Sequence, residues 1–74
     1  MKEHIIELLS EALPAVDFGS DFLFSELDSL GIATILAILM NEYGITLDYF
    51  DVTPKNFMNV DSLVEMVKSK LDEK

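Results

Sequence analysis

The sequence predicts a single, small all-α domain, and three observations lead to that prediction. Apolar residues recur at helical spacing in three segments, 2–13, 29–43 and 62–71. Residues that end helices, Pro14 and Gly44, follow the first two of these segments. The 74 residues suffice for one small hydrophobic core and leave no room for a second domain.

The first predicted helix covers residues 2–13 and is amphipathic. Its isoleucine and leucine residues form one stripe, and three glutamates oppose them. Pro14 ends this helix. The stretch 15–28 then loses the helical period but remains rich in phenylalanine and leucine. Because such side chains avoid water, we expect this long loop to lie on the helices.

The second predicted helix, residues 29–43, carries more apolar residues than one core needs. One apolar stripe follows the core spacing and comprises Ile32, Ile35, Leu36, Leu39 and Tyr43. A second stripe on an adjacent face comprises Leu30, Ala33, Ala37 and Met40. This second stripe is either a binding surface or is buried against the long first loop.

Two further helices are predicted toward the C-terminus. A Thr-Pro pair precedes segment 55–58 and is typical of a helix cap followed by a first-turn proline, which predicts a short helix there. Ser62 is followed three residues later by Glu65, which is the spacing of a capping box. We therefore expect the last helix, residues 62–71, to begin at Ser62.

The charge and the absence of cysteine exclude several classes of function. Fourteen acidic residues face five lysines and no arginine, for a net charge of −9. Such a surface repels phosphate backbones, so nucleic-acid binding is not expected, and a basic protein partner is the natural complement. No cysteine is present, so the chain itself offers no disulfide, thiolate metal site or thiol nucleophile.

Nothing in the sequence predicts export or membrane insertion. The N-terminal residues lack the pattern of a signal peptide. The longest nearly apolar run, residues 30–40, is too short to span a bilayer. We expect a cytoplasmic protein without a membrane span.

The tripeptide Asp-Ser-Leu occurs twice, and the two serines have different surroundings. The capping box gives the hydroxyl of Ser62 a structural role. Ser29 has Ile32 at the position equivalent to Glu65, so no such box engages it. Its hydroxyl is available at a helix N-terminus, where a phosphate ester is favoured. The alternative is that Ser29 is only a helix cap.

A catalytic role for Ser29 requires a neighbouring base, which the sequence does not supply. The only histidine, His4, is expected to face solvent on the first helix, and the nearest lysine in sequence is Lys55. The loop acids have no calcium-loop spacing, so no metal site is expected. Ser29 is better interpreted as a residue on which another enzyme acts, and the chain is not expected to be an enzyme.

Two stretches resemble the acyl carrier protein family. ELDSLGIATILAILMNEYGITL resembles the region around the modified serine of that family, in which Asp-Ser-Leu opens the second helix. TPKNFMNVDSLVEMVKSKL resembles its short third helix and its fourth helix. The resemblance implies an acyl-carrier-like four-helix bundle, with three main helices and a short third one, that is monomeric.

This resemblance also implies a cofactor and a modification. Ser29 would be esterified by 4′-phosphopantetheine, transferred from coenzyme A by a phosphopantetheinyl transferase that supplies the missing base and metal. Asp28 matches the acidic residue of the family next to that serine, and would assist recognition by the transferase. The arm ends in a thiol, which would hold acyl groups as thioesters in a chain that has no cysteine.

The resemblance assigns a partner-binding role to residues around Ser29. Leu30, Ala33, Ala37 and Met40 would face synthase or transferase enzymes or shelter the arm, with Glu26 and Glu42 as the remaining acids nearby.

Carriers of fatty-acid synthesis place more acids along the second helix than this chain does. The sequence therefore looks more like D-alanyl, aminoacyl or peptidyl carriers charged by adenylating ligases. An alternative of another class is a helical interaction module without catalytic activity.

Overall fold

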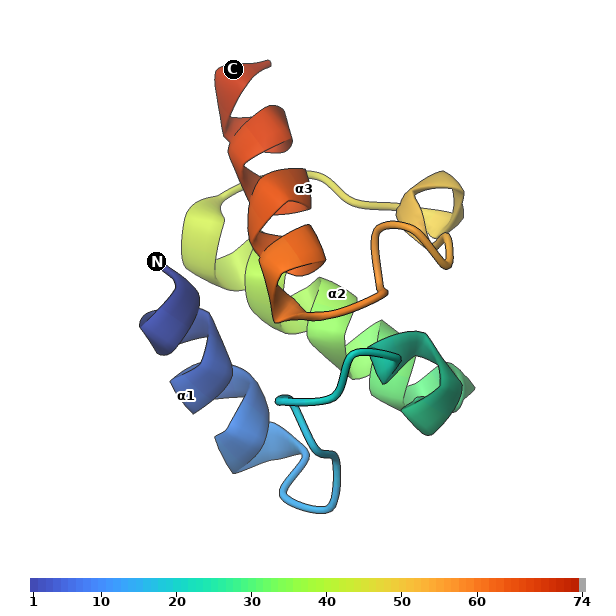
Figure 1. Cartoon of the computed structure of the whole chain (residues 1–74). Coiled ribbons are helices and arrows are strands. Elements are labelled where there is room, and N and C mark those ends of the chain that lie inside the picture. Colours follow the sequence, from blue (N-terminus) through green and yellow to red (C-terminus); the bar gives the residue numbers. More distant parts are fainter. Residues whose placement is uncertain (74) are drawn as a thin grey trace.

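The computed structural model describes residues 1–73 and is all-helical, as the sequence predicts (Figure 1). No strand occurs in this part of the chain. Its elements are α1 (Lys2–Ala12), the 3₁₀ helix η1 (Leu23–Glu26), α2 (Ser29–Tyr43), the 3₁₀ helix η2 (Tyr49–Asp51) and α3 (Val60–Asp72). The three main helices of the predicted bundle are thus present, and each of them contacts the other two.

The bounds of α1 and α2 agree closely with the sequence. Helix α1 ends at Ala12, one residue before the predicted end, and Pro14 follows. Helix α2 begins at Ser29 and ends at Tyr43 as predicted. Gly44 takes the left-handed conformation with φ 62°, and its amide donates to the Met40 carbonyl at 2.9 Å.

The predicted start of the last helix is wrong by two residues. The capping box predicted between Ser62 and Glu65 is wrong as well, because Ser62 is not the N-cap. Helix α3 begins at Val60, and its N-cap is Asn59, whose Oδ1 accepts the Ser62 amide at 2.9 Å. Asparagine is as good an N-cap as serine, and the earlier start places Val60 in the core at 2% exposure. Ser62 is therefore inside the helix, and its Oγ donates to the same Asn59 oxygen at 3.1 Å.

The short helix predicted over 55–58 is not formed. Residues 54–57 make a single hydrogen-bonded turn, in which the Phe57 amide donates to the Thr53 carbonyl at 3.0 Å. Thr53 does cap this turn, because its Oγ1 accepts the Asn56 amide at 3.1 Å. The chain cannot continue as a helix, since Asn59 has to adopt the extended conformation that starts α3.

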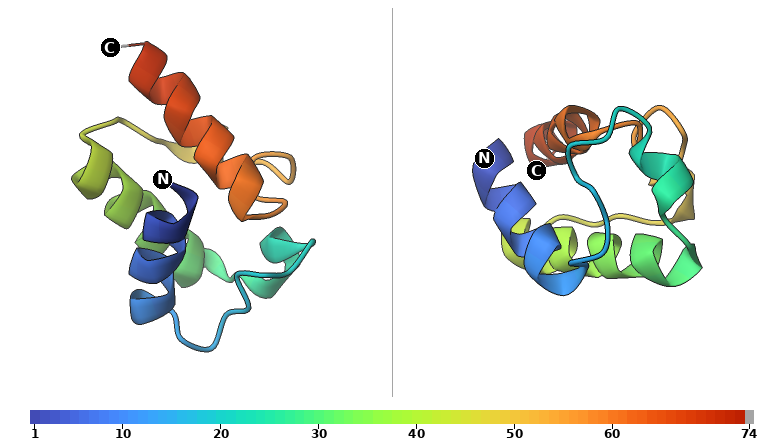
Figure 2. Two further views of the ribbon diagram at one scale, coloured as in Figure 1. Left: turned by 60° about the vertical axis from the view of Figure 1, so that its left-hand side comes forward. Right: turned by 60° about the horizontal axis from the view of Figure 1, so that its bottom comes forward.

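The core lies between the three helices and also takes side chains from both long connections. The fully or nearly fully buried residues are Ile5, Leu9, Phe18, Leu23, Ile35, Leu39, Ile45, Leu47, Phe57, Val60, Leu63, Val64, Met66 and Val67. The prediction that the first loop lies on the helices is confirmed, because Phe18 and Leu23 belong to this core. The Leu23 amide also donates to the Met58 carbonyl at 2.7 Å and joins the two connections. Figure 2 shows the first connection crossing one end of the molecule.

Within residues 1–73, none of the helices combines the length and the apolar character that crossing a bilayer requires.

Two leucines of α2 test this core. Leu39→Ala removes a side chain with 0% exposure and is expected to lower the free energy of unfolding by about 2 to 5 kcal/mol. Leu30→Ala removes one that is 74% exposed and should change it by less than about 0.5 kcal/mol. Urea denaturation followed by circular dichroism measures both. Equal losses would contradict the placement of α2.

Candidate functional site

Ser29 is the first residue of α2, but it does not cap the helix. The N-cap is Asp28, whose Oδ1 accepts the Gly31 amide at 2.7 Å. Ser29 is exposed, and its hydroxyl makes no hydrogen bond to any other part of residues 1–73. The alternative that Ser29 serves as the helix cap is therefore wrong, because the preceding aspartate holds that position.

Gly31 leaves the space that the Asp28 carboxylate occupies. A Cβ atom at this position would lie 3.3 Å from Asp28 Oδ1 and 3.4 Å from Leu27 Cδ2. The first of these contacts is tight and would require the carboxylate, which accepts the Gly31 amide, to shift by a few tenths of an ångström. Glycine thus relieves a close contact with the carboxylate in the first turn.

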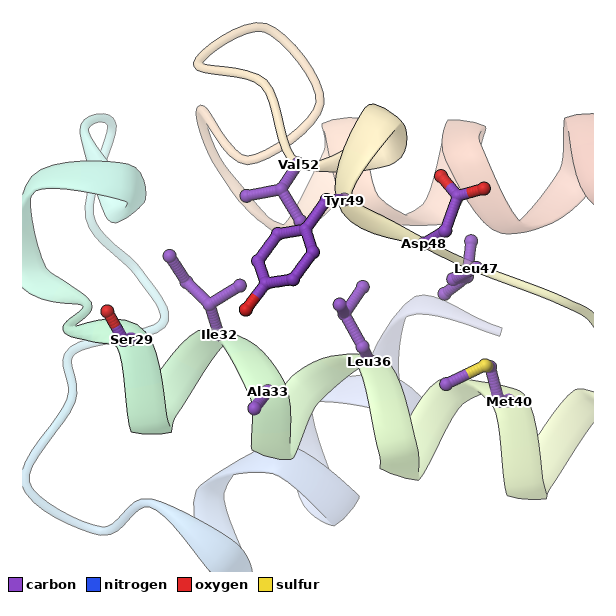
Figure 3. A pocket seen from close by; sticks show the side chains of 9 residues that line it. All are labelled: Ser29, Ile32, Ala33, Leu36, Met40, Leu47, Asp48, Tyr49 and Val52. Carbon is purple, nitrogen blue, oxygen red and sulfur yellow. The ribbon is translucent and has the colours of Figure 1, made fainter.

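An apolar groove begins at Ser29 and has a volume of about 370 Å³ (Figure 3). One wall is the side of α2 that carries Ser29, Ile32, Ala33, Leu36 and Met40. The opposite wall is formed by Leu47, Asp48, Tyr49 and Val52. In Figure 3 the Tyr49 ring is directed toward α2, and the Asp48 carboxylate is directed away from it.

The predicted second stripe of α2 divides between this groove and the open surface. Ala33 and Met40 line the groove, whereas Leu30 and Ala37 do not. Leu30 is 74% exposed, and Ala37 is exposed as well. The expected core stripe divides in the same way, since Ile35 and Leu39 are buried but Ile32 and Leu36 are half-buried and line the groove.

The two predicted acidic partner residues lie far from each other. Glu26 belongs to η1, and its Oε1 accepts the Asp17 amide at 3.3 Å. Glu42 lies near the C-terminal end of α2, roughly 20 Å along the helix from Ser29. Its Oε2 lies 2.7 Å from Nε2 of His4, so the two side chains join α1 to α2. His4 is exposed, as predicted, but this contact was not foreseen.

The sequence analysis missed the second wall of the groove. The sequence predicts only a connecting segment over residues 44–52, because apolar residues show no helical period there. The available signal was the alternation of Ile45 and Leu47, which are both buried and anchor an extended segment. Asp48 and Asp51 then form a reciprocal capping box around η2.

The Asp51 carboxylate is held by an ion pair and by a hydrogen bond. Its Oδ1 lies 3.1 Å from Nζ of Lys70 on α3, and its Oδ2 accepts the Asp48 amide at 3.0 Å. Burial alone would raise the pKa of Asp51, but the Asp48 amide and the Lys70 ammonium outweigh it and hold this pKa below its ordinary value of 3.8. The hydrogen bond to Asp51 in turn raises the pKa of Lys70.

Two other features bear on the chemistry of the site. Burial, assisted by the charge of Glu42, raises the pKa of the Tyr43 hydroxyl above its ordinary value. Among residues 1–73, no three histidine or acidic side chains are grouped so that they could hold a metal ion.

No family model, curated protein or solved structure matches the chain.

The cap assignment predicts a difference between two neighbouring substitutions. Asp28→Ala removes the acceptor of the Gly31 amide and should cost about 1 kcal/mol of unfolding free energy. Ser29→Ala removes an exposed hydroxyl and should change stability by less than about 0.5 kcal/mol. Asp28→Asn keeps an acceptor and serves as the control. A larger loss in Ser29→Ala than in Asp28→Ala would show that the helix starts one residue later.

Asp51 also predicts an acid dependence of stability. Because its pKa is lowered in the folded chain, its contribution is present above the ordinary pKa of an aspartate and is lost as the pH falls through the folded value. Asp51→Asn should therefore flatten the decline of melting temperature below pH 4, and Glu7→Gln on the exposed face of α1 controls for net charge. An identical acid decline in wild type and Asp51→Asn would contradict the assignment.

Proposed function

We propose that the chain is a carrier protein that holds acyl or aminoacyl groups as thioesters on a 4′-phosphopantetheine arm attached to Ser29. The observation that carries this proposal is the exposed Ser29 hydroxyl, which makes no hydrogen bond within residues 1–73 and lies at the end of an apolar groove. The resemblance of the surrounding sequence to acyl carrier proteins supplies the identity of the arm.

The contrast with Ser62 supports the choice of Ser29. Both serines stand in the tripeptide Asp-Ser-Leu. The Ser62 hydroxyl is half-buried and donates to Asn59 Oδ1 at 3.1 Å, so modification would break a contact at the start of α3. Modification of Ser29 breaks no hydrogen bond that residues 1–73 make, because the Asp28 carboxylate already caps α2.

The residues around Ser29 fit a phosphodiester. The first amides of a helix have no partner within the helix, and its N-terminal end is the positive end of the dipole, so a phosphate esterified to Ser29 is favoured there. The carboxylate of Asp28 is engaged by the Gly31 amide. The arm, when attached, supplies the thiol that a chain without cysteine lacks.

Among residues 1–73 no base is placed to activate Ser29, which supports a role as the substrate of another enzyme. His4 contacts Glu42 near the opposite end of α2. The groove beside Ser29 is lined mainly by apolar side chains, with Asp48 directed away from α2. The expected partner is therefore a phosphopantetheinyl transferase, for which Asp28 is the adjacent recognition residue.

The side chains on the surface of α2 favour an assignment to the carriers that adenylating ligases charge, and not to the carriers of fatty-acid synthases. The positions at which fatty-acid carriers usually place acids along this helix hold Gly31, Thr34, Ala37, Ile38 and Asn41 in this chain. The proposed cargo is accordingly an amino acid, such as D-alanine, or an unusual acyl group. Leu30 and Ala37 would contact the ligase and the acceptor enzyme, and a cytoplasmic location fits both.

The exposed apolar side chains favour a second candidate function, a helical interaction module. Leu30, Tyr49 and Phe50 are 74%, 85% and 92% exposed. In such a module these side chains would bind a partner directly, and Ser29 would have no covalent role.

Loading by a transferase separates the two candidates. We expect wild type and Ser62→Ala, incubated with coenzyme A and a broad-specificity phosphopantetheinyl transferase, to gain one phosphopantetheine each, and Ser29→Ala to gain none. Intact-mass spectrometry with peptide mapping reads the result, and circular dichroism confirms that each variant is folded. Loading of Ser29→Ala would refute the site, and failure of folded wild type would favour the interaction module.

A further inference from the structure

The segment 48–52, called the strap here, forms one wall of the groove and is tied to the rest of the chain by few contacts. At one end Leu47 is 5% exposed and belongs to the core, and at the other end Val52 is half-buried. Between these anchors, Tyr49 and Phe50 are 85% and 92% exposed. The strap therefore buries little apolar surface of its own, and polar contacts must decide how firmly it is held.

The principal polar contact from the strap to another helix is the ion pair between Asp51 and Lys70 of α3, at 3.1 Å. The two side chains are only 16% and 25% exposed, whereas those of the surface pair Lys2–Asp61 are 51% and 70% exposed. Partial exclusion of water strengthens the attraction between charges and weakens its screening by salt. This pair is thus less screened by salt than the surface pair, while partial desolvation keeps its expected contribution within the range of about 0.2 to 1 kcal/mol, or at most about a fivefold change in how often the strap opens.

Asp51 also organises the strap internally. Its Oδ2 accepts the Asp48 amide at 3.0 Å, and Asp48 Oδ1 accepts the Phe50 amide at 2.9 Å. The side-chain amide of Asn56 donates to the Asp51 carbonyl at 3.0 Å. Asp51 therefore stabilises η2 and also attaches it to α3. Loss of the ion pair is thus expected to loosen the strap.

We propose that the Asp51–Lys70 ion pair is a latch that ties the strap to α3, keeps it beside α2 and sets how often the groove opens. When the pair separates, the strap swings from α2 about its two anchored ends, and Ile32 and Leu36 become accessible, while the three-helix core stays folded. The latch is a property of the unmodified chain and does not depend on the proposed role of Ser29.

Amide hydrogen exchange tests the latch on two variants. Lys70→Met removes the ammonium and keeps an apolar stem, and Asp51→Asn removes the carboxylate charge and keeps an acceptor for the Asp48 amide. In both variants the protection factors of the amides at positions 51 and 52, which correct for the intrinsic exchange rate of the substituted residue, should be about two- to fivefold lower than in wild type. The control Lys68→Met makes the same change of charge at an exposed position of α3 and should leave those protection factors unchanged.

Two readouts distinguish the latch from general destabilisation. The amides of Ile35 and Leu39 in the core of α2 should remain more strongly protected than those of residues 51 and 52 in wild type and in both latch variants, because the core stays folded when the strap opens. Lys70 also lies 3.9 Å from Glu73, and only Lys70→Met removes that contact. An effect in Lys70→Met alone would assign the stabilisation to Glu73, and equal protection of the strap and core amides would show that the strap opens only by global unfolding; either result overturns the proposal.

The absence of cysteine allows a direct measurement of groove opening. A single thiol from Leu36→Cys lies in the groove wall, and one from Ala37→Cys lies outside the groove on the same helix. When Lys70→Met is added to each of these variants, the thiol at position 36 should react with N-ethylmaleimide about two- to fivefold faster than it does with Lys70 present. The thiol at position 37 should react at an unchanged rate. An unchanged rate for the groove thiol overturns the latch.

Discussion

The hydrogen bond from the Gly31 amide to the Asp28 carboxylate, at 2.7 Å, is the contact on which the candidate site depends. It marks where α2 begins, while the burial of Ile35 and Leu39 sets which face of this helix is turned to the core. With Asp28 as the cap, Ser29 falls at the first helical position with its hydroxyl uncommitted. A cap one residue later would engage that hydroxyl and remove the feature on which the proposed function rests. Gly31 relieves a tight contact with the carboxylate, because a Cβ atom there would lie 3.3 Å from Asp28 Oδ1.

The two Asp-Ser-Leu tripeptides show that the position of the N-cap relative to the tripeptide, and not the tripeptide itself, decides whether the serine hydroxyl is engaged. At α2 the aspartate of the tripeptide is the N-cap, and at α3 the cap is Asn59, two residues before the aspartate. The serine of the second tripeptide therefore lies one turn inside its helix and bonds to the cap residue. The same tripeptide thus leaves the Ser29 hydroxyl without a hydrogen bond within residues 1–73, whereas the Ser62 hydroxyl donates to Asn59.

Residues with strong local preferences made most of the helical architecture predictable. Pro14 and Gly44 end helices through their backbone geometry alone, so the bounds of α1 and α2 followed from the sequence. The start of α3 did not, because serine and asparagine cap equally well and burial of Val60 decides between them. Ser29 was identifiable from its neighbours, but the groove was not. Its second wall contains Asp51, which pairs with Lys70 nineteen residues away, and no local pattern encodes that pairing.

Scalar couplings across hydrogen bonds, measured by nuclear magnetic resonance on the labelled chain, test the central claim most directly. The account predicts a coupling between the Gly31 amide nitrogen and the Asp28 side-chain carboxylate carbon, and another between the Ile32 amide nitrogen and the Asp28 carbonyl carbon. Both belong to a helix capped by Asp28. Absence of both couplings, with the helical series beginning at the bond from Ala33 to Ser29, would make Ser29 the cap and contradict the account.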